Sequence, residues 1–445
     1  MYQKVKGTYD LLPADTAKWQ AVERTIKSVS KIYNYKEIRT PIFEKTDLFH
    51  RGVGSDTDIV SKETYDFLDR AGRSNTLRPE GTAGVVRSYI ENKIYVNPLK
   101  VSKLFYIGPM FRYERPQKGR YRQFSQFGAE LFGSYSPLAD AEIISYAVNV
   151  LKALKIEDVT VHLNSIGDSE SKETYKKVLK DYLANDIESL CSDCQRRFVK
   201  NPLRILDCKV DSKSELLMNA PAPIEHLNEE SKKHFDQVIE YLDAMKIEYI
   251  IDNSLVRGLD YYTHTVFEVK TGLKTLGSQN TLCGGGRYNN LVKELGGPDI
   301  PAVGFAFGFE RLMLALEAID FKGDKDYLHL YLMVLGEKPK KDAVAMLNKC
   351  RLGGLLADID FLDKGMKQQF KQADLHQARF IAIYGENEMA NETINIKDKV
   401  KNTEVTISKH ELYNHIITEL MAQDDNCSTC GDETDCETCE PGGNE

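Results

Sequence analysis

The chain has 445 residues, of which 42% are hydrophobic and 28% are charged, and its formal net charge is −8. This length suits two or three domains, and this composition is typical of a soluble globular protein. The apolar runs are shorter than the ~20 residues that a membrane-spanning helix needs. The first residues lack the apolar core of a secretion signal, so we expect a cytoplasmic protein that does not bind a membrane.

The negative charge is concentrated near the C-terminus. Residues 424–445 hold eight acidic residues and no Lys or Arg, which leaves 59 acidic and 59 basic residues in the rest of the chain. Any nucleic-acid contact must therefore use local basic patches. Residues 423–445 lack periodicity and are predicted to form a disordered acidic tail that contains cysteines.

The N-terminal half predicts a helix followed by strands. Apolar residues recur at three- and four-residue steps from Trp19 to Ile32, which indicates an amphipathic helix beginning near Pro13. Residues 36–44 are predicted to be extended. The apolar runs 104–111 and 124–132 predict an antiparallel hairpin, and a further strand is expected at 159–163.

Residues 170–250 are highly charged and predicted to be mostly helical, as an insertion between parts of one sheet. Strand signals return near Tyr249 and at 266–269, and a helix is expected to begin near Gly308. Residues 1–325 are therefore predicted to be an α+β catalytic domain built on an antiparallel sheet flanked by helices.

A polar stretch at 320–326 predicts a linker. After it, strands alternate with helices, which is typical of a small α/β domain, predicted over residues 327–422. The predicted strands are 328–334, 355–361 and 380–384, and the predicted helices are 340–351 and 364–373.

The segment between the hairpin strands is strongly cationic. It carries five cations and one acid between Arg112 and Arg122. Arginine presents a planar fork that matches phosphate oxygens in pairs, so this loop suits a polyphosphate or an RNA backbone, with Phe124 able to stack on a base. A solvated charged loop is an equally good interpretation.

Two segments offer carboxylates. In Arg78-Pro79-Glu80-Gly81-Thr82, a carboxylate and a hydroxyl could hold an ammonium group, although Thr82 could instead cap a helix. In the strand 124–132, period two places Gln126, Gly128 and Glu130 on one face. That face could be a pocket floor with room for a ligand, or a solvent-facing surface.

Three further segments combine glycine or tyrosine with arginine. Arg257-Gly258-Leu259-Asp260-Tyr261-Tyr262 could bind phosphate and a polar ring, or form a turn with core tyrosines. The run 283–288 brings bare glycine backbone beside a cation, which permits close approach to a ligand. Arg311 is expected in the first turns of a helix, where the dipole also favours anions.

In their order along the chain, these segments resemble the motifs of class II aminoacyl-tRNA synthetases. The matching features are a strand ending in Pro41, Arg112-x-Glu114 with a loop and Arg120-x-x-x-Phe124, and Gly308-x-x-Arg311. Within that class, residues 78–82, 108–124 and above all 257–262 look like the histidine-specific family. The resemblance covers residues 1 to about 420.

The resemblance implies a role for each matching residue. Histidine would be bound by Glu80, Thr82, Gln126, Glu130, Tyr261 and Tyr262, with Glu130 and Tyr262 on the imidazole nitrogens and the glycines 284–286 lining the pocket. ATP would be bound by Arg112, Glu114, Phe124 and Arg311, and the catalytic residues would be Arg112 and Arg257. The loop residues Arg115, Gln117, Lys118 and Arg120 are predicted to contact tRNA.

The implied activity is that of a histidine–tRNA ligase. ATP and L-histidine would form histidyl-adenylate and pyrophosphate, with Mg²⁺ bridging the leaving phosphates, and histidine would then pass to the 3′ end of tRNA(His). The C-terminal domain would bind the anticodon, and the chain would form a homodimer. Two alternatives are a regulatory subunit of histidine biosynthesis without catalysis, and an RNA- or histidine-sensing module.

The chain has nine cysteines. Cys427-x-x-Cys430 and Cys436-x-x-Cys439 have pair spacing like that of zinc ligands, but the gap between the pairs is short for a zinc ribbon. Cys191, Cys194 and Cys208 could supply three zinc ligands without an obvious fourth. We therefore predict a reduced structural cluster and no bound metal.

Overall fold

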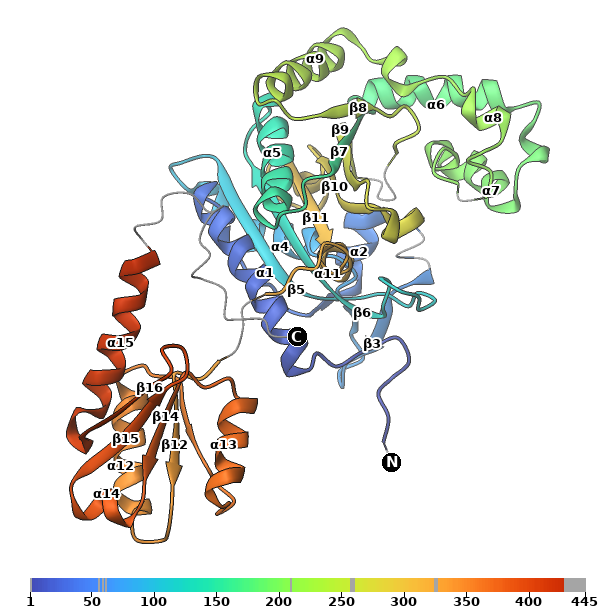
Figure 1. Ribbon diagram of the computed structural model, residues 1–445. Coiled ribbons are helices and arrows are strands. Elements are labelled where there is room, and N and C mark those ends of the chain that lie inside the picture. Colours follow the sequence, from blue (N-terminus) through green and yellow to red (C-terminus); the bar gives the residue numbers. More distant parts are fainter. Residues whose placement is uncertain are drawn as a thin grey trace. The chain divides into compact units, whose positions relative to one another are not determined.

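The computed structural model describes residues 2–54, 57, 60, 62–208, 210–256, 261–323 and 327–427. The chain divides into two compact units, Met1–Gly323 and the residues that follow (Figure 1). Within the described residues, no helix is both long enough and apolar enough to cross a membrane.

An eight-stranded sheet forms the centre of the first unit, with the order β1-β5-β6-β11-β10-β9-β7-β8. The six central strands are antiparallel to one another, and the edge strands β1 and β8 lie parallel to β5 and β7. The predicted antiparallel sheet and the β5–β6 hairpin are confirmed. The strands are β1 (Lys36–Glu37), β5 (Ser102–Phe111), β6 (Gln123–Phe132), β7 (Val159–Ser165), β8 (Tyr249–Ile251), β9 (Thr263–Thr271), β10 (Thr281–Arg287) and β11 (Ala302–Gly308).

Each face of this sheet packs against its own set of helices. One face forms an apolar cluster with helices α1 (Pro13–Ile32), α5 (Pro137–Ala153), α9 (Glu229–Ala244) and α11 (Phe309–Ala318). The other face packs against α4 (Thr82–Glu91), α10 (Leu291–Glu294) and the part of the chain between Ile166 and Leu217. Adjacent residues on β5 divide between the two faces, as the pleat requires: Phe105 joins the first cluster and Tyr106 the second.

The first helix has the predicted start, with Pro13 in its first turn, and buries Trp19, Val22, Ile26 and Val29. Ile32, which the periodicity also placed on the buried face, is 78% exposed. It is the last residue of α1, where the apolar stripe has turned away from the sheet.

The predicted helical insertion lies between β7 and β8, two strands of the same sheet. Its helices are α6 (Ser169–Leu183), α7 (Ser192–Lys200), α8 (Glu215–Met218) and α9. Helix α9 contributes Phe235, Val238 and Leu242 to the core shared with α5. In Figure 1, α6, α7 and α8 instead form a lobe that extends beyond the sheet.

A second, three-stranded sheet has the order β2-β4-β3 and precedes α4. Its strands are β2 (Phe43–Lys45), β3 (Tyr65–Leu68) and β4 (Ser74–Leu77), with the short helix α2 (Thr46–Phe49) after β2. Because β4 ends five residues before α4 begins, the turn at Arg78–Gly81 is held at both ends.

The second unit is a five-stranded sheet with the order β13-β12-β14-β15-β16 and helices around it. Its elements are β12 (Leu330–Val334), α12 (Lys340–Leu352), β13 (Ala357–Ile359), α13 (Met366–Leu375), β14 (Phe380–Tyr384), α14 (Glu386–Ala390), β15 (Thr393–Asp398), β16 (Thr403–Ser408) and α15 (Leu412–Cys427). The predicted α/β alternation is confirmed through β14, and the antiparallel β15 and β16 were not predicted. Helix α15 continues to Cys427, so the predicted irregular tail cannot begin at 423; residues 428–445 lie outside the described part of the chain.

Candidate active site

A cavity of about 460 Å³ lies against the large sheet and is lined by residues of β6, β9, β10 and β11. It brings together most of the residues singled out in the sequence. Those that line it are Glu80, Thr82, Arg112, Glu114, Arg120, Phe124, Gln126, Glu130, Tyr261, Tyr262, Gly284 and Arg311. These residues come from segments as far as 231 positions apart, from Glu80 to Arg311.

One end of the cavity is acidic and deeply buried. Glu80 is 4% exposed, and its two carboxylate oxygens accept hydrogen bonds from the backbone N–H groups of Thr82 (2.9 Å) and Ala83 (2.7 Å). Glu80 therefore caps α4, a role that the sequence had offered to Thr82. Burial raises the pKa of Glu80 above its ordinary value, although these hydrogen bonds oppose the change.

Glu130, on β6, is 1% exposed. The Thr82 hydroxyl donates a hydrogen bond to Glu130 Oε1 at 2.7 Å, and the Tyr288 hydroxyl donates one to Oε2. Burial raises the pKa of Glu130 to about 8, while the two hydroxyl donors act in the opposite direction. Near neutral pH this carboxyl group therefore sits close to its titration point.

The glycines around this end make room for protein side chains. A Cβ at Gly81 or Gly128 would lie 2.2–2.3 Å from the Tyr106 ring, so the Tyr106 ring occupies the space above Gly128 that the sequence had offered to a ligand. Gly286 likewise makes room for Tyr262, and Gly285 for Phe267 and the Gly304 carbonyl. Of the glycines 284–286, only Gly284 lines the cavity.

The cation next to that glycine run does not face the cavity. Arg287 is fully buried on the other side of β10, where its Nε lies 3.0 Å from both carboxylate oxygens of Asp140. It also donates to the carbonyls of Ser134 (2.8 Å) and Ser136 (3.0 Å) at the start of α5. Arg287 is therefore a structural anchor for α5, and of the run 283–288 it is the glycine backbone at Gly284, not this cation, that reaches the cavity.

Two tyrosines and an amide complete the acidic end. The rings of Tyr261 and Tyr262 lie 4.8 Å apart, and Tyr261 meets Tyr288 edge-on at 5.4 Å. The Oε1 atom of Gln126 is buried and accepts no hydrogen bond within the described residues. This oxygen is available to a donor on a bound molecule.

The other end of the cavity is cationic. Arg311, in the first turn of α11, donates to the Thr281 carbonyl at 3.2 Å, and burial lowers its pKa, with the charges of Arg120 and Arg112 acting in the same direction. Arg120 lies 3.6 Å from Glu114. Arg112 donates from Nε to the Pro79 carbonyl (2.8 Å), and its guanidinium lies 5.2 Å from the centre of the Phe124 ring.

Arg112 stands between the two ends. Its charge acts on Glu80 at the acidic end and on Arg311 at the cationic end. A molecule that bridged both ends would therefore pass beside Arg112.

Known proteins match both units. A sequence model described as Histidyl-tRNA synthetase matches residues 7–312, and one described as Anticodon binding domain matches residues 329–419. The chain belongs to the histidyl-tRNA synthetase family. Relatives named Histidine--tRNA ligase include one from Geobacillus sp., 48% identical over 94% of this chain and 99% of its own length, and one from Bacillus subtilis, 49% identical over 92% and 97%. A crystal structure of the apo histidyl-tRNA synthetase of S. aureus superposes with a TM-score of 0.81 at 41% identity and covers 94% of this chain and all of that one.

In this member of the histidyl-tRNA synthetase family, some residues of the cationic loop line the cavity or a recess beside it, and others do not. Arg112 and Arg120 line the cavity, and Lys118 lines an adjoining recess beside Arg311. Arg115 and Gln117 line neither; the backbone of Gln117 pairs with that of Arg120 across the loop turn. Residues 257–260, including the predicted catalytic Arg257, lie outside the described residues.

Several cavity residues were missed in the sequence. They are Asp207, Glu268, Thr281, Tyr288 and Glu310. Tyr288 directly follows β10, and its distance of four positions from Gly284 could have suggested that it lies on the same side of the chain. Glu310 directly precedes Arg311 and accepts hydrogen bonds from the Tyr9 hydroxyl (2.7 Å) and the Ser125 N–H (2.8 Å), contacts between distant segments that no local pattern reveals.

Proposed function

We propose that this protein is a histidine–tRNA ligase, which forms histidyl-adenylate from L-histidine and ATP and then transfers histidine to the 3′ end of tRNA(His). The observation that carries the proposal is a single cavity with a buried acidic end and a cationic end, joined at Arg112. Such a cavity suits one substrate with an ammonium group and a second with a polyphosphate.

The acidic end fits histidine. Its ammonium group would meet Glu80, the free Gln126 Oε1 and Thr82, which are acceptors for its three donors. Glu130 would accept the imidazole N–H, and Tyr262 would hydrogen-bond the other ring nitrogen. A buried carboxylate that is left without this N–H would pay a desolvation cost, so the pocket would discriminate strongly against residues that lack a ring donor.

The cationic end fits ATP. Phe124 would stack on the adenine with Glu114 near its amino group, and Arg311 would hold the γ-phosphate. Arg112 would grip the α-phosphate and the histidine carboxylate as they react, and Arg257 is proposed for the same charge. A carboxylate needs no base to attack phosphorus, so positioning and charge stabilisation account for the catalysis.

The cavity also fits Mg²⁺ as a partner of ATP. Glu268 and Glu310 line it and offer carboxylate oxygens, which together with phosphate oxygens are the ligands that Mg²⁺ prefers. When bound, the ion would neutralise charge on the leaving pyrophosphate. Glu268 accepts a hydrogen bond from the Thr281 hydroxyl (3.1 Å), which orients this carboxylate.

The proposal extends to tRNA and to assembly. Residues 1–325 would be the catalytic domain and the residues from 327 to the end of α15 the anticodon-binding domain of a cytoplasmic protein, with an acidic tail after α15. Arg115, Gln117, Lys118 and Arg120 would meet the acceptor end of the tRNA. The family resemblance at the first motif supports a homodimer, which sedimentation of the full chain would test.

Histidine-dependent ATP–pyrophosphate exchange tests the activity directly. The folded protein should exchange only when histidine is present and should charge tRNA(His). Replacing Arg112 with Gln should lower exchange by roughly 10²–10³-fold, as the loss of one charge-stabilising donor does. Absence of exchange in the folded parent protein would refute the ligase and leave a histidine- or RNA-sensing module; a regulatory subunit is disfavoured because Arg112 and Arg311 both line the cavity.

A further inference from the structure

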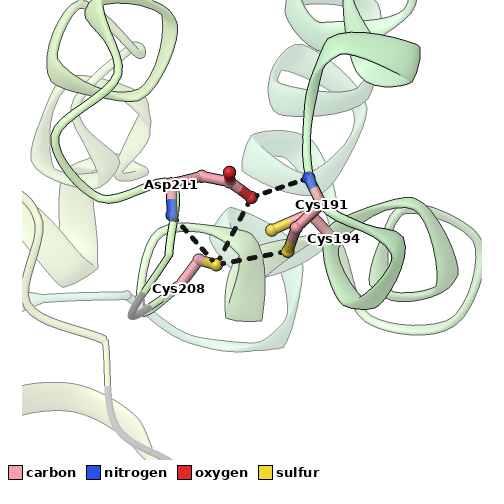
Figure 2. A group of neighbouring side chains, drawn as sticks. All are labelled: Cys191, Cys194, Cys208 and Asp211. Atoms are coloured by element: carbon pink, nitrogen blue, oxygen red, sulfur yellow. Dashed lines mark hydrogen bonds between the residues drawn. The ribbon is translucent and has the colours of Figure 1, made fainter.

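We propose that Cys191, Cys194, Cys208 and Asp211 form a structural Zn²⁺ site in the helical insertion. Their ligand atoms, three sulfurs and one carboxylate oxygen, all lie within 4.8 Å of one another. Figure 2 shows the four side chains converging on one point from two separate segments. Asp211 is the fourth ligand that the sequence pattern of three cysteines lacked.

The spacing suits a tetrahedral ion. Thiolates bound at a Zn–S distance of ~2.3 Å lie roughly 3.8 Å apart in a tetrahedron, and the Cys191 and Cys208 sulfurs are 3.6 Å apart. Cys191 is the residue before α7 and Cys194 lies in its first turn, so a separation of three residues places both on one side of the helix start. Cys208 and Asp211 approach from the other segment, with the Cys208 sulfur 3.4 Å from Asp211 Oδ2.

Backbone groups already support these ligands. The N–H of Cys191 donates to Asp211 Oδ2 at 3.0 Å, and the N–H of Asp211 donates to the Cys208 sulfur at 3.4 Å. Donors of this kind orient ligands and stabilise their negative charge around a bound metal. A cluster of three thiols kept only for packing would not need a carboxylate held among them by the backbone.

The ligand set favours zinc. Three soft thiolates exclude Mg²⁺ and Ca²⁺, and tetrahedral sulfur sites are typical of Zn²⁺. Four protein ligands leave no open position, as in structural sites. A disulfide between Cys191 and Cys208 would leave Cys194, which is fully buried, and Asp211 without a role in the cluster.

The site borders the catalytic cavity. Asp207, next to Cys208, lines that cavity, and an adjoining pocket is shared by Asp207, Cys208 and Glu268. Cys194 and Cys208 belong to the same apolar cluster as Tyr261 and Tyr262. Zinc would therefore hold the insertion in place beside the catalytic cavity, a consequence that rests on the proposed function, whereas the metal site itself does not.

The metal content of the full chain tests the site. Because the tail could bind zinc by itself, the test uses as its parent the full chain with the substitutions Cys427→Ser, Cys430→Ser, Cys436→Ser and Cys439→Ser. Purified under reducing conditions in the presence of Zn²⁺ and then freed of loose metal, it should retain about one zinc per chain by elemental analysis. Reconstitution with Co²⁺ should give thiolate charge-transfer absorption and the intense visible bands of a tetrahedral site. Zinc near zero with no cobalt spectrum would overturn the proposal.

Variants locate the ion. Cys208→Ser should abolish the cobalt thiolate spectrum, and Asp211→Ala should weaken zinc in competition with a chromophoric chelator by roughly tenfold or more. Cys350→Ser, at a buried cysteine of the second unit, is the matched control and should retain full zinc. Should Cys208→Ser fail to fold, Asp211→Ala carries the test, and parental affinity in that variant would overturn the site.

Activity separates the two proposals. Chelation of zinc should raise the KM for histidine in pyrophosphate exchange, and readdition of Zn²⁺ should restore it. Unchanged kinetics after complete zinc loss would refute the link to the cavity while the stoichiometry still supports the metal site. Absence of exchange in the untreated parent would refute the ligase activity without touching the zinc measurement.

Discussion

The hydroxyl of Tyr288 should set the pH range in which this protein binds histidine. It is one of two hydroxyls that donate to Glu130, whose pKa is raised to about 8 by burial. In the proposed histidine site, the charged form of Glu130 would accept the N–H of a neutral imidazole. Histidine binding should therefore strengthen as the pH rises through about 8.

Tyr288→Phe removes this donor without changing the ring. A hydrogen bond to a charged group contributes about 1.5–3 kcal/mol, which corresponds to a rise in the pKa of Glu130 by roughly 1–2 pH units. At an assay pH below the parental pKa, the charged fraction then falls by roughly tenfold to a hundredfold. The KM for histidine should rise by the same factor, with little change in the KM for ATP.

Pyrophosphate exchange measured across a pH series gives the profile. In the variant, the pH at which the KM for histidine reaches its plateau should move upward. Tyr89→Phe, at a buried tyrosine outside the cavity, is the control for loss of a hydroxyl and should overlay the parent profile. If the Tyr288→Phe profile also overlays it, Glu130 does not titrate with histidine binding and the assigned role is wrong.

Three further perturbations follow from the same contacts. A Cβ at Gly304 would lie 1.8 Å from Glu130 Oε2 and 2.6 Å from the Ala129 carbonyl oxygen, so Gly304→Ala should displace the carboxylate, raise the KM for histidine by roughly tenfold to a hundredfold and lower the melting temperature. Gly308→Ala, whose Cβ meets nothing within 4 Å, should leave the melting temperature unchanged, and an equal loss of melting temperature in the two variants would contradict this reasoning. Arg287→Met leaves the Asp140 carboxylate charged and buried, which should lower the free energy of unfolding by about 3–5 kcal/mol and the melting temperature of the first unit by roughly 4–7 °C in calorimetry. Adding Asp140→Asn should restore part of this stability. A loss of stability no larger than that of a surface ion pair would count against a buried anchor. Because the folded pKa of Glu130 (about 8) lies above its ordinary 4.5, the folded state binds more protons between these values, so the free energy of unfolding without histidine should fall by up to roughly 5 kcal/mol as the pH rises through this window. Glu130→Gln should remove that slope in urea titrations, and an unchanged slope would refute the assignment.

Local periodicity was sufficient for much of the fold. The β5–β6 hairpin follows from two apolar runs around a charged loop, and the alternation of β12, α12, β13, α13 and β14 was legible because each element carries its own pattern. The pair β15–β16 was missed although Ile394 and Ile396 alternate with polar residues, because β16 is largely exposed and carries little apolar signal. The pairing of β6 with β11 joins residues more than 160 positions apart and has no local signal.

The sequence singled out many of the residues that the cavity brings together, but it did not reveal their contacts. Residue types and spacing singled out Glu80, Thr82 and Glu130, but only the fold reveals that Thr82 donates to Glu130 while Glu80 caps α4. The sequence could not show which way Arg287 points, because a cation beside glycines fits a phosphate site as well as a buried ion pair. Only the side of β10 on which it lies distinguishes the two, and that depends on strands far away in sequence.

The opposite orientation of Arg287 and Tyr288 has a consequence for substitutions outside the cavity. Arg287 clamps the start of α5 on one face of the strand, and Tyr288, the next residue, holds Glu130 on the other. Because Arg287 and Tyr288 are adjacent, the packing of α5 is directly linked to the position of Glu130, which is proposed to bind the histidine side chain. A substitution beneath α5 that leaves the chain folded can therefore displace Glu130, and in the proposed reaction it should raise the KM for histidine although it lies outside the cavity.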